Sequence, residues 1–172
     1  MNGFFLFLPL LFIRFGLLGI LDPQALKRAA HFAPVEGKER LAYSFYQLAN
    51  LGIFIYPFFI SVSTVPICFW VGLGIYIFGI MLCLVSTVDF AKPNESGLNQ
   101  NGIYRFSRNP MYLSYFFYFL GCVLMTQSWI LLLILLVFQV SAHWIILSEE
   151  RWCLNHFGQS YKNYLKEARR YF

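Results

Sequence analysis

The sequence predicts an all-α membrane protein: a polytopic helical bundle of five transmembrane helices with an amphipathic helix at its C-terminus. Three observations lead to this prediction. Of the 172 residues, 59% are hydrophobic and only 12% are charged, whereas soluble domains carry about a quarter charged residues. The hydrophobic residues gather into runs close to the ~20 residues that cross a bilayer. The basic residues are sorted into alternate connectors between these runs.

Five apolar runs are the expected transmembrane helices. They cover Gly3–Leu21, Tyr43–Val62, Pro66–Val88, Met111–Met125 and Trp129–Ser148. Only residues 126–128 separate the last two runs, so we expect these runs to form a tight helical hairpin. The third run contains Gly72, Gly74 and Gly79, and glycines at such positions let neighbouring membrane helices approach closely.

The distribution of charge predicts the orientation. Of the 13 Lys and Arg residues, 12 fall in the connectors 22–42 and 89–110 or after residue 148. The positive-inside rule therefore places the N-terminus outside and the C-terminus in the cytosol. All eight Asp and Glu residues lie on that same side, so charge chemistry is expected at the cytosolic face. The net charge of +5 does not indicate a nucleic-acid partner, because the basic residues lie in the connectors on one side of the predicted membrane. The exception, Arg14, is expected to extend its side chain toward the inner surface, and a functional role is the less favoured alternative.

The length allows a single membrane domain over residues 1–172, with three N-terminal spans in 1–90 and the functional loop, hairpin and surface helix in 91–172. The four cysteines share no metal-type spacing, so neither a metal site nor a disulfide framework is expected.

Three local patterns predict shorter elements. Asp22 before Pro23 is typical of a helix start, and we expect a short surface helix over Gln24–His31. The last apolar helix is expected to continue to about Asn155 and to end near Gly158. The amphipathic helix then runs toward Phe172, lying on the membrane surface and covering the site as a lid.

The polar turn before the fourth span is the first candidate site. Asn109 is expected to cap this span and Pro110 to occupy its first turn. The free N–H groups of a helix start favour an anion, and Arg105 and Arg108 add positive charge, so a ligand carboxylate would fit. The alternative is that these arginines only anchor the span.

Glu149 and Glu150 follow the fifth span and are the second candidate site. A carboxylate at the hydrocarbon boundary is costly unless it faces protein, water or a cation. The alternative is that both lie among the lipid head groups and pair with Arg105, Arg108 or Arg151. His143 lies about two turns deeper and, taken alone, is more typical of a packing residue.

Taken together, these segments resemble the isoprenylcysteine carboxyl methyltransferase and phospholipid methyltransferase superfamily. Its hallmark is G-x-Y-R-x-x-R-H-P-x-Y-x-G, then E-E-x-x-L, then F-G-x-x-Y-x-x-Y. The matching segments are Gly102-Ile-Tyr-Arg-Phe-Ser-Arg-Asn-Pro-Met-Tyr112, Glu149-Glu150-Arg-Trp-Cys-Leu154 and Phe157-Gly-Gln-Ser-Tyr161-Lys-Asn-Tyr164. The chain departs from the pattern at Asn109 in place of His, at Ser114 in place of Gly, and at Leu154, which is displaced by one position.

The resemblance implies methyl transfer from S-adenosylmethionine to a lipophilic acceptor at the cytosolic face, with no metal. The acceptor is either a prenylcysteine-like carboxylate or a phospholipid amine. It further implies catalytic roles for Arg105, Arg108 and Glu150. The implied cofactor contacts are Tyr104, Arg108, Asn109, Pro110, Tyr112, His143, Glu149, Glu150 and Tyr161. Two other functions stay open: a membrane reductase that uses a nicotinamide cofactor, and a non-catalytic ligand-binding or scaffold protein of the same fold.

Overall fold

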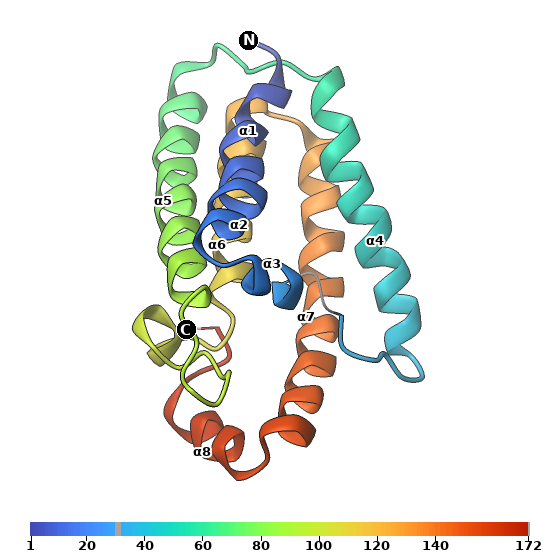
Figure 1. Ribbon diagram of the computed structural model, residues 1–172. Helices are drawn as coiled ribbons and strands as arrows, with labels where there is room; N and C mark the ends of the chain where they lie inside the picture. Colours follow the sequence, from blue (N-terminus) through green and yellow to red (C-terminus); the bar gives the residue numbers. More distant parts are fainter. Residues whose placement is uncertain (30–31, 172) are drawn as a thin grey trace.

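The computed structural model describes residues 1–29 and 32–171, and over these residues the regular structure is helical (Figure 1). Two isolated β-bridges, Asn2 with Ser61 and Ser107 with Arg169, are the only strand-like pairings in this part of the chain. The prediction of an all-α fold is therefore confirmed for the described residues.

The first helical segment coincides with the first apolar run. It consists of η1 (Gly3–Phe7), α1 (Leu8–Leu11), the π-helical η2 (Phe12–Leu17) and α2 (Leu18–Leu21). The short helix α3 (Pro23–Ala29) follows. The Asp22 carboxylate accepts the backbone N–H groups of Gln24 and Ala25 at 2.9 and 3.0 Å, so the predicted helix start is confirmed. The predicted end of this helix at His31 lies outside the described residues.

Four longer helices follow, and the predicted apolar runs locate all of them. They are α4 (Glu39–Ile55, continued by η3, Tyr56–Phe59), α5 (Pro66–Phe90), α6 (Pro110–Thr126) and α7 (Trp129–Phe157). The short η4 (Gly102–Arg105) precedes α6, and α8 (Gln159–Glu167) follows α7. Helix α7 ends one residue before Gly158, which has φ +55°. The predicted continuation of this helix to about Asn155 and its end near Gly158 are thus confirmed.

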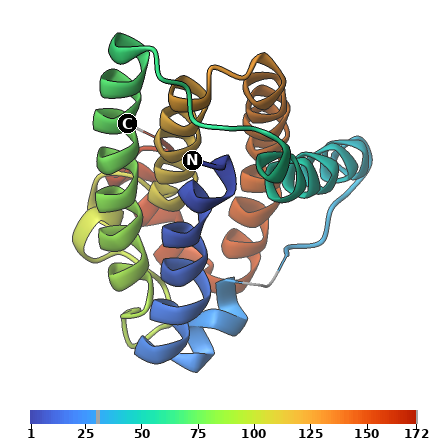
Figure 2. The ribbon, with the colours of Figure 1, turned by 90° about the horizontal axis from the view of Figure 1, so that it is seen from above.

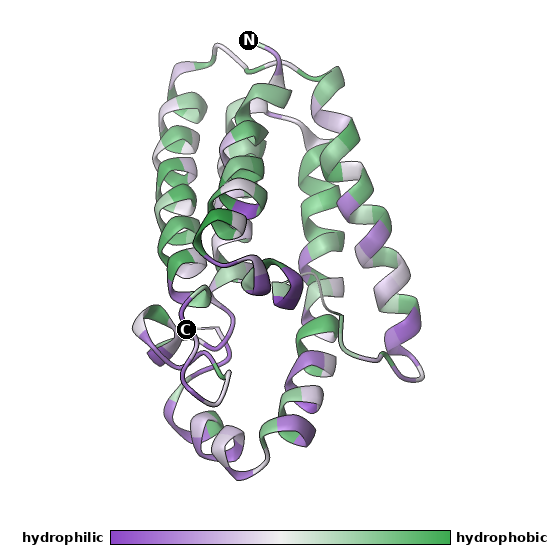
Figure 3. Ribbon diagram, viewed as in Figure 1, coloured by the Kyte–Doolittle hydropathy of each residue, from purple (hydrophilic) through white to green (hydrophobic). Residues whose placement is uncertain are grey.

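Three helices of the described chain are long and apolar enough to cross a membrane: Gly3–Leu21, α5 and α7. The 17 residues of α6, like the 17 of α4, span only about 25 Å at ~1.5 Å per residue. The three long apolar helices show that the chain is a membrane protein. Because α4 and α6 are short, the predicted count of five crossings is not confirmed. Hydrophobic residues cover the long helices, and polar residues gather at the end that carries α3 and α8 (Figure 3).

The helices pack in two pairs. Helix α5 packs along α6, and α4 packs along α7, with the N-terminal segment lying against α5 (Figures 1 and 2). A connection of two residues joins α6 to α7, and Gln127 in it has φ +50°. The short connection is as predicted, but the tight α6–α7 hairpin is not confirmed, because each helix makes its main contacts with another partner.

Glycines hold α5 and α6 at close range. A Cβ on Gly79 would lie 2.4 Å from the backbone nitrogen of Tyr118, and one on Gly121 would lie 2.6 Å from the backbone of Tyr76. Gly72 is similarly tight, at 2.9 Å from Leu124. The predicted close approach is confirmed for Gly72 and Gly79. It is wrong for Gly74, which meets no described atom within 4 Å.

Two tyrosines from this pair anchor the N-terminal segment. The hydroxyls of Tyr76 and Tyr118 both donate to the backbone carbonyl of Leu6, the former at 2.7 Å. Pro9, three residues after Leu6, has no N–H to offer this carbonyl. Because an unpaired backbone group in an apolar medium costs several kcal/mol, these bonds fix the N-terminal segment against α5 and α6.

We expect Gly121→Ala to destabilise the protein by roughly 1–3 kcal/mol, because overpacking forces the α5 and α6 backbones apart. Gly74→Ala is the matched control and should be neutral or stabilising by up to about 1 kcal/mol, because alanine is the better helix former. Reversible unfolding in detergent measures both. Equal stability of the two variants would contradict the close α5–α6 contact.

Candidate functional site

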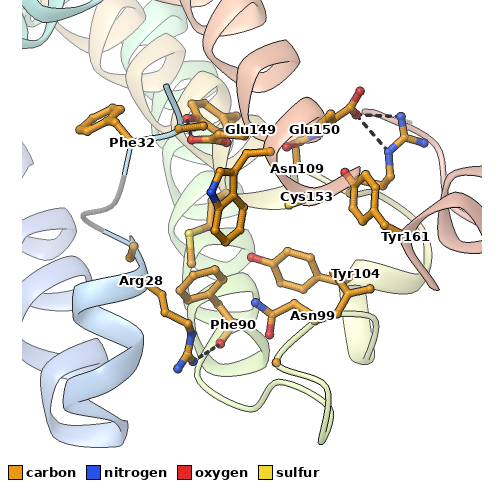
Figure 4. Close-up of a pocket in the computed structure, with 18 of the residues that line it drawn as sticks. Arg28, Phe32, Phe90, Asn99, Tyr104, Asn109, Glu149, Glu150, Cys153 and Tyr161 are labelled. Atoms are coloured by element: carbon orange, nitrogen blue, oxygen red, sulfur yellow. Dashed lines mark hydrogen bonds and ion pairs between the residues drawn. The ribbon is translucent and has the colours of Figure 1, made fainter. Parts of the chain in front are cut away.

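A cavity of about 530 Å³ lies at the polar end of the bundle. Its walls come from α3, the C-terminal half of the first segment, the loop before α6, the start of α6, the end of α7, and α8 (Figure 4). The predicted site residues that line it are Tyr104, Arg108, Asn109, Tyr112, Glu149, Glu150 and Tyr161. The two halves of the predicted site, far apart in sequence, therefore meet in one cavity.

Three other predicted residues lie elsewhere. Arg105 is exposed and outside the cavity lining. Pro110 is buried in the first turn of α6, as expected, and does not reach the lining. His143 Nδ1 lies 2.7 Å from the hydroxyl of Tyr171, also outside the lining. The packing role expected for an isolated histidine is the one that the structure supports.

Glu150 is held between two arginines. Its Oε1 accepts from Arg108 Nη2 at 2.8 Å, and its Oε2 accepts from Arg170 Nη2 at 2.8 Å. The Glu150 and Arg108 side chains are each 10% exposed, whereas the Arg170 side chain is 36% exposed. The hydrogen bond to Glu150 raises the pKa of Arg170. Both oxygens of this carboxylate are thus already neutralised by the protein.

The other side of Arg108 joins the C-terminal segment. Its Nη1 donates to the carbonyl of Ala168, and its backbone N–H donates to the carbonyl of Arg169 at 2.8 Å. The guanidinium bond is charge-assisted, and such bonds are about twice as strong as neutral ones. Arg108 therefore connects the start of α6, the end of α7 and the last residues of the chain, and its donors are largely used in doing so.

Residues 168–171 leave the helix and form a non-helical segment beside the polar turn, which we call the C-terminal strap. The Ser107 hydroxyl donates to the Arg170 carbonyl at 3.3 Å, and Arg169 N–H donates to the Phe106 carbonyl at 3.3 Å. Helix α8 ends at Glu167, so the predicted helix is wrong from Ala168 onward, and Phe172 lies outside the described residues. Backbone pairing with the turn replaces the last helical turn.

Asn109 takes part in this pairing and not in the predicted cap. It occupies the position before α6, but among the described residues its side chain makes no capping hydrogen bond. Its amide instead donates to the Arg170 carbonyl at 3.1 Å. The prediction that the Asn109 side chain caps α6 is therefore wrong: a cap would accept through the amide oxygen, whereas the observed bond uses the amide N–H to hold the strap.

Glu149 differs from Glu150 in its hydrogen-bond partner and in having no ion pair among the described residues. The Tyr112 hydroxyl donates to it at 3.0 Å, and within the described chain no cationic group lies within ion-pair distance of it. Figure 4 shows Glu149 directed toward the side of Phe32 and Glu150 toward Tyr161. Glu149 is thus the lining carboxylate whose charge the described protein leaves unpaired.

Tyrosines from η4 and α8 form another part of the cavity wall. The Tyr164 hydroxyl donates to the Tyr104 carbonyl at 2.6 Å, and both side chains are buried together with Tyr161. Burial raises the pKa of all three phenols, so they stay neutral. The predicted apolar face of the C-terminal helix is confirmed for Tyr161 and Tyr164, which are buried and line the cavity.

Sequence reasoning missed the cavity wall from the N-terminal half. Arg14, Arg28 and Tyr46 line the cavity, as does Asn99 from the loop. Arg28 pairs with Asp22 at 3.2 Å and lies 5.7 Å from the centre of the Phe90 ring. The one available signal was a single arginine inside an otherwise apolar run.

The residues that form this cavity fall largely within a segment that matches a known protein family. A family model described as phospholipid methyltransferase matches residues 67–160. This chain belongs to the phospholipid methyltransferase family. The match runs from α5 to the start of α8 and includes the polar turn, the Glu149-Glu150 pair and Gly158, so the resemblance drawn from the sequence is confirmed. Neither a curated protein nor a solved structure gives a significant match. The family is one of membrane methyltransferases, which supports an enzymatic function for this member.

We expect Glu150→Gln to destabilise this member of the family by roughly 3–5 kcal/mol, because removing one partner of a buried ion pair leaves the other charge uncompensated. Unfolding in detergent measures the effect, and limited proteolysis should show the C-terminal strap released first. Glu36→Gln is the control, because that carboxylate is 73% exposed and lies 3.9 Å from Arg151, and it should change stability by less than about 0.5 kcal/mol. Equal effects of the two changes would show that Glu150 does not hold the strap.

Proposed function

We propose that this protein transfers a methyl group from S-adenosylmethionine to the amine of a lipophilic acceptor, a phospholipid-like amine, at the cytosolic face of the membrane. The observation that carries the proposal is Glu149, a carboxylate unpaired within the described chain, in a cavity at the polar end of a phospholipid methyltransferase family member. Members of this family generally use S-adenosylmethionine as the donor.

The proposed chemistry asks little of the protein. The donor supplies a methyl group on a positively charged sulfur, and the acceptor nitrogen displaces that sulfur in one step. As the N–C bond forms and the C–S bond breaks, the nitrogen must lose one proton. Glu149 is positioned to accept this proton, and the Tyr112 hydroxyl at 3.0 Å fixes the orientation of the carboxylate. The rest of the cavity aligns the reactants and excludes water.

The choice between the two acceptor classes follows from Glu149. Arg108 and Arg170 are committed to Glu150, but Arg14 also lines the cavity and could pair with a carboxylate acceptor. Methylation of a carboxylate releases no proton, however, and would leave Glu149 without a role. An amine acceptor needs a carboxylate, and Glu149 is available. The amine is therefore the acceptor that this arrangement supports best.

The proposed donor contacts are Tyr104, Asn109, Tyr112 and Tyr161, which line the cavity on the side of α6 and α8. Arg108 and Glu150 act in this proposal as positioning residues that hold the cavity wall. Arg105, Pro110 and His143, which lie outside the lining, are left out of the proposed site.

The proposal includes the orientation of the chain. One membrane domain over residues 1–172 with five crossings, the N-terminus outside and the C-terminus in the cytosol, would place the cavity where a water-soluble donor is present. The gathering of polar residues at the end that carries α3 and α8 (Figure 3) supports this arrangement. Family membership favours methyl transfer over nicotinamide-dependent reduction.

A non-catalytic relative is the remaining alternative, and Asn109 in the place of His motivates it. The Asn109 amide donates to the Arg170 carbonyl, a structural role that does not require a side chain able to gain or lose a proton. The departure is therefore compatible with an active site in which Glu149 takes the proton.

We expect Glu149→Gln to lower the rate of methyl transfer by about 10²–10⁴-fold, the usual contribution of a positioned general base. Binding of S-adenosylmethionine should stay within a few-fold of wild type. Transfer of labelled methyl to phosphatidylethanolamine in detergent micelles measures the rate, and titration calorimetry measures donor binding. Tyr112→Phe should give a smaller loss, because it removes only an orienting bond.

Glu36→Gln serves as the control for loss of an acidic side chain, since Glu36 is exposed and outside the cavity. Donor binding without transfer by the wild-type protein would support the non-catalytic alternative. Full activity of Glu149→Gln would remove Glu149 from the mechanism.

A further inference from the structure

Arg14 is a charged residue inside the apolar helix Gly3–Leu21, and its side chain lines the cavity. Its Nη2 donates to the Ala29 carbonyl at 2.7 Å, and its Nη1 contacts the sulfur of Met111 at 3.4 Å. Within the described residues no carboxylate lies within 4.0 Å of the guanidinium. A cation at membrane depth is costly, so an unneutralised one indicates a functional site.

The backbone around Arg14 is unusual as well. Residues Phe12–Leu17 form a π-helical turn between α1 and α2. Such turns are rare and are found frequently at functional sites. Ile13 and Leu18 are buried in the protein core, whereas Phe12 and Phe15 are exposed. The segment thus keeps its core contacts through Ile13 and Leu18 while Arg14 lines the cavity.

The surroundings of Arg14 are suited to an anion. Tyr46 and Tyr115 line the same cavity and carry hydroxyl donors. Arg28 also lines it, and its Nε is buried without a hydrogen-bond partner among the described residues. Glu149 belongs to the same cavity. The cavity therefore offers donors and positive charge from the first segment and α3, and a carboxylate from α7.

We infer that Arg14 binds the oxyanion of a ligand, either the phosphodiester of the acceptor lipid or the carboxylate of the methyl donor. The inference rests on the proposed function and adds a subsite to it. A zwitterionic acceptor lipid would place its phosphate at Arg14 and its amine toward Glu149, so the two residues together fix its direction in the cavity. If the donor carboxylate lies at Arg14 instead, Glu149 stays available for the acceptor amine.

The two sources of the oxyanion are separated by matched ligands. The donor pair is S-adenosylmethionine and its decarboxylated form, which lacks only the carboxylate. The acceptor pair is lysophosphatidylethanolamine and octadecylamine, which presents an amine without phosphate. Binding of each donor and the KM of each acceptor are measured for the wild type, Arg14→Gln and Arg14→Lys. Arg40→Gln is the control, because Arg40 is exposed and lies outside the cavity.

In Arg14→Gln, the loss of a charge-assisted hydrogen bond should weaken binding of the relevant ligand by about tenfold to a hundredfold. If the affinity for S-adenosylmethionine falls and the affinity for its decarboxylated form does not, Arg14 binds the donor carboxylate. If the KM of lysophosphatidylethanolamine rises and that of octadecylamine does not, Arg14 binds the phosphate. Arg14→Lys should retain part of either effect. Equal changes within both pairs, or no change in either, would overturn the inference and leave Arg14 as a packing residue.

The wild type alone keeps the inference testable if Arg14→Gln does not fold. Equal affinity of the wild type for both members of each pair excludes any oxyanion subsite. The proposed function has a separate test, since it fails when the wild type neither binds S-adenosylmethionine nor transfers its methyl group. In that case thermal stabilisation by lysophosphatidylethanolamine, compared with octadecylamine, still reports on the oxyanion at Arg14.

Discussion

The Glu150 carboxylate between Arg108 and Arg170 is the interaction on which the functional end of the molecule depends. Each arginine comes from a different part of the chain, one before α6 and one in the C-terminal strap, while Glu150 belongs to α7. The Glu150 and Arg108 side chains are each only 10% exposed, and taking such charges out of water is costly unless their hydrogen bonds are satisfied. Here both carboxylate oxygens and most donors of Arg108 are used. Because the charges cannot separate without leaving one of them unpaired, they fix the positions of the elements that enclose the cavity.

This cluster also divides the work between two adjacent glutamates. Neighbouring residues on a helix point about 100° apart, at 3.6 residues per turn, so Glu149 cannot reach the arginines that neutralise Glu150. It meets the Tyr112 hydroxyl and the cavity in their place. A carboxylate that the described protein leaves without a cation can accept a proton or a positive charge from a ligand. Two residues of the same type thus acquire different roles from their direction alone.

The sequence predicted the helices well because their signals are local. Apolar runs located each long helix, Asp22 predicted the start of α3, and Gly158 the end of α7. Which helices pair is not local, because it depends on the shapes of two surfaces. Helix α6 packs mainly on α5, through Gly79 and Gly121, and makes only a smaller contact with α7. The C-terminal strap was missed for the same reason: its basic residues resemble a charged helix face, whereas backbone pairing with a turn some 60 positions earlier decides its conformation.

Arg14 shows why half of the candidate site was invisible in the sequence. A single arginine in an apolar helix reads as one that extends its side chain to the membrane surface, and nothing nearby in the chain says otherwise. Only the fold brings the first segment beside α6 and α7, so that Arg14 and Glu149 line one cavity. On the proposed assignment, the separation of a fixed positive and a fixed negative charge selects the ligand. That criterion suits an enzyme whose lipophilic acceptors share a head group, because the acyl chains can remain in the bilayer and need no recognition.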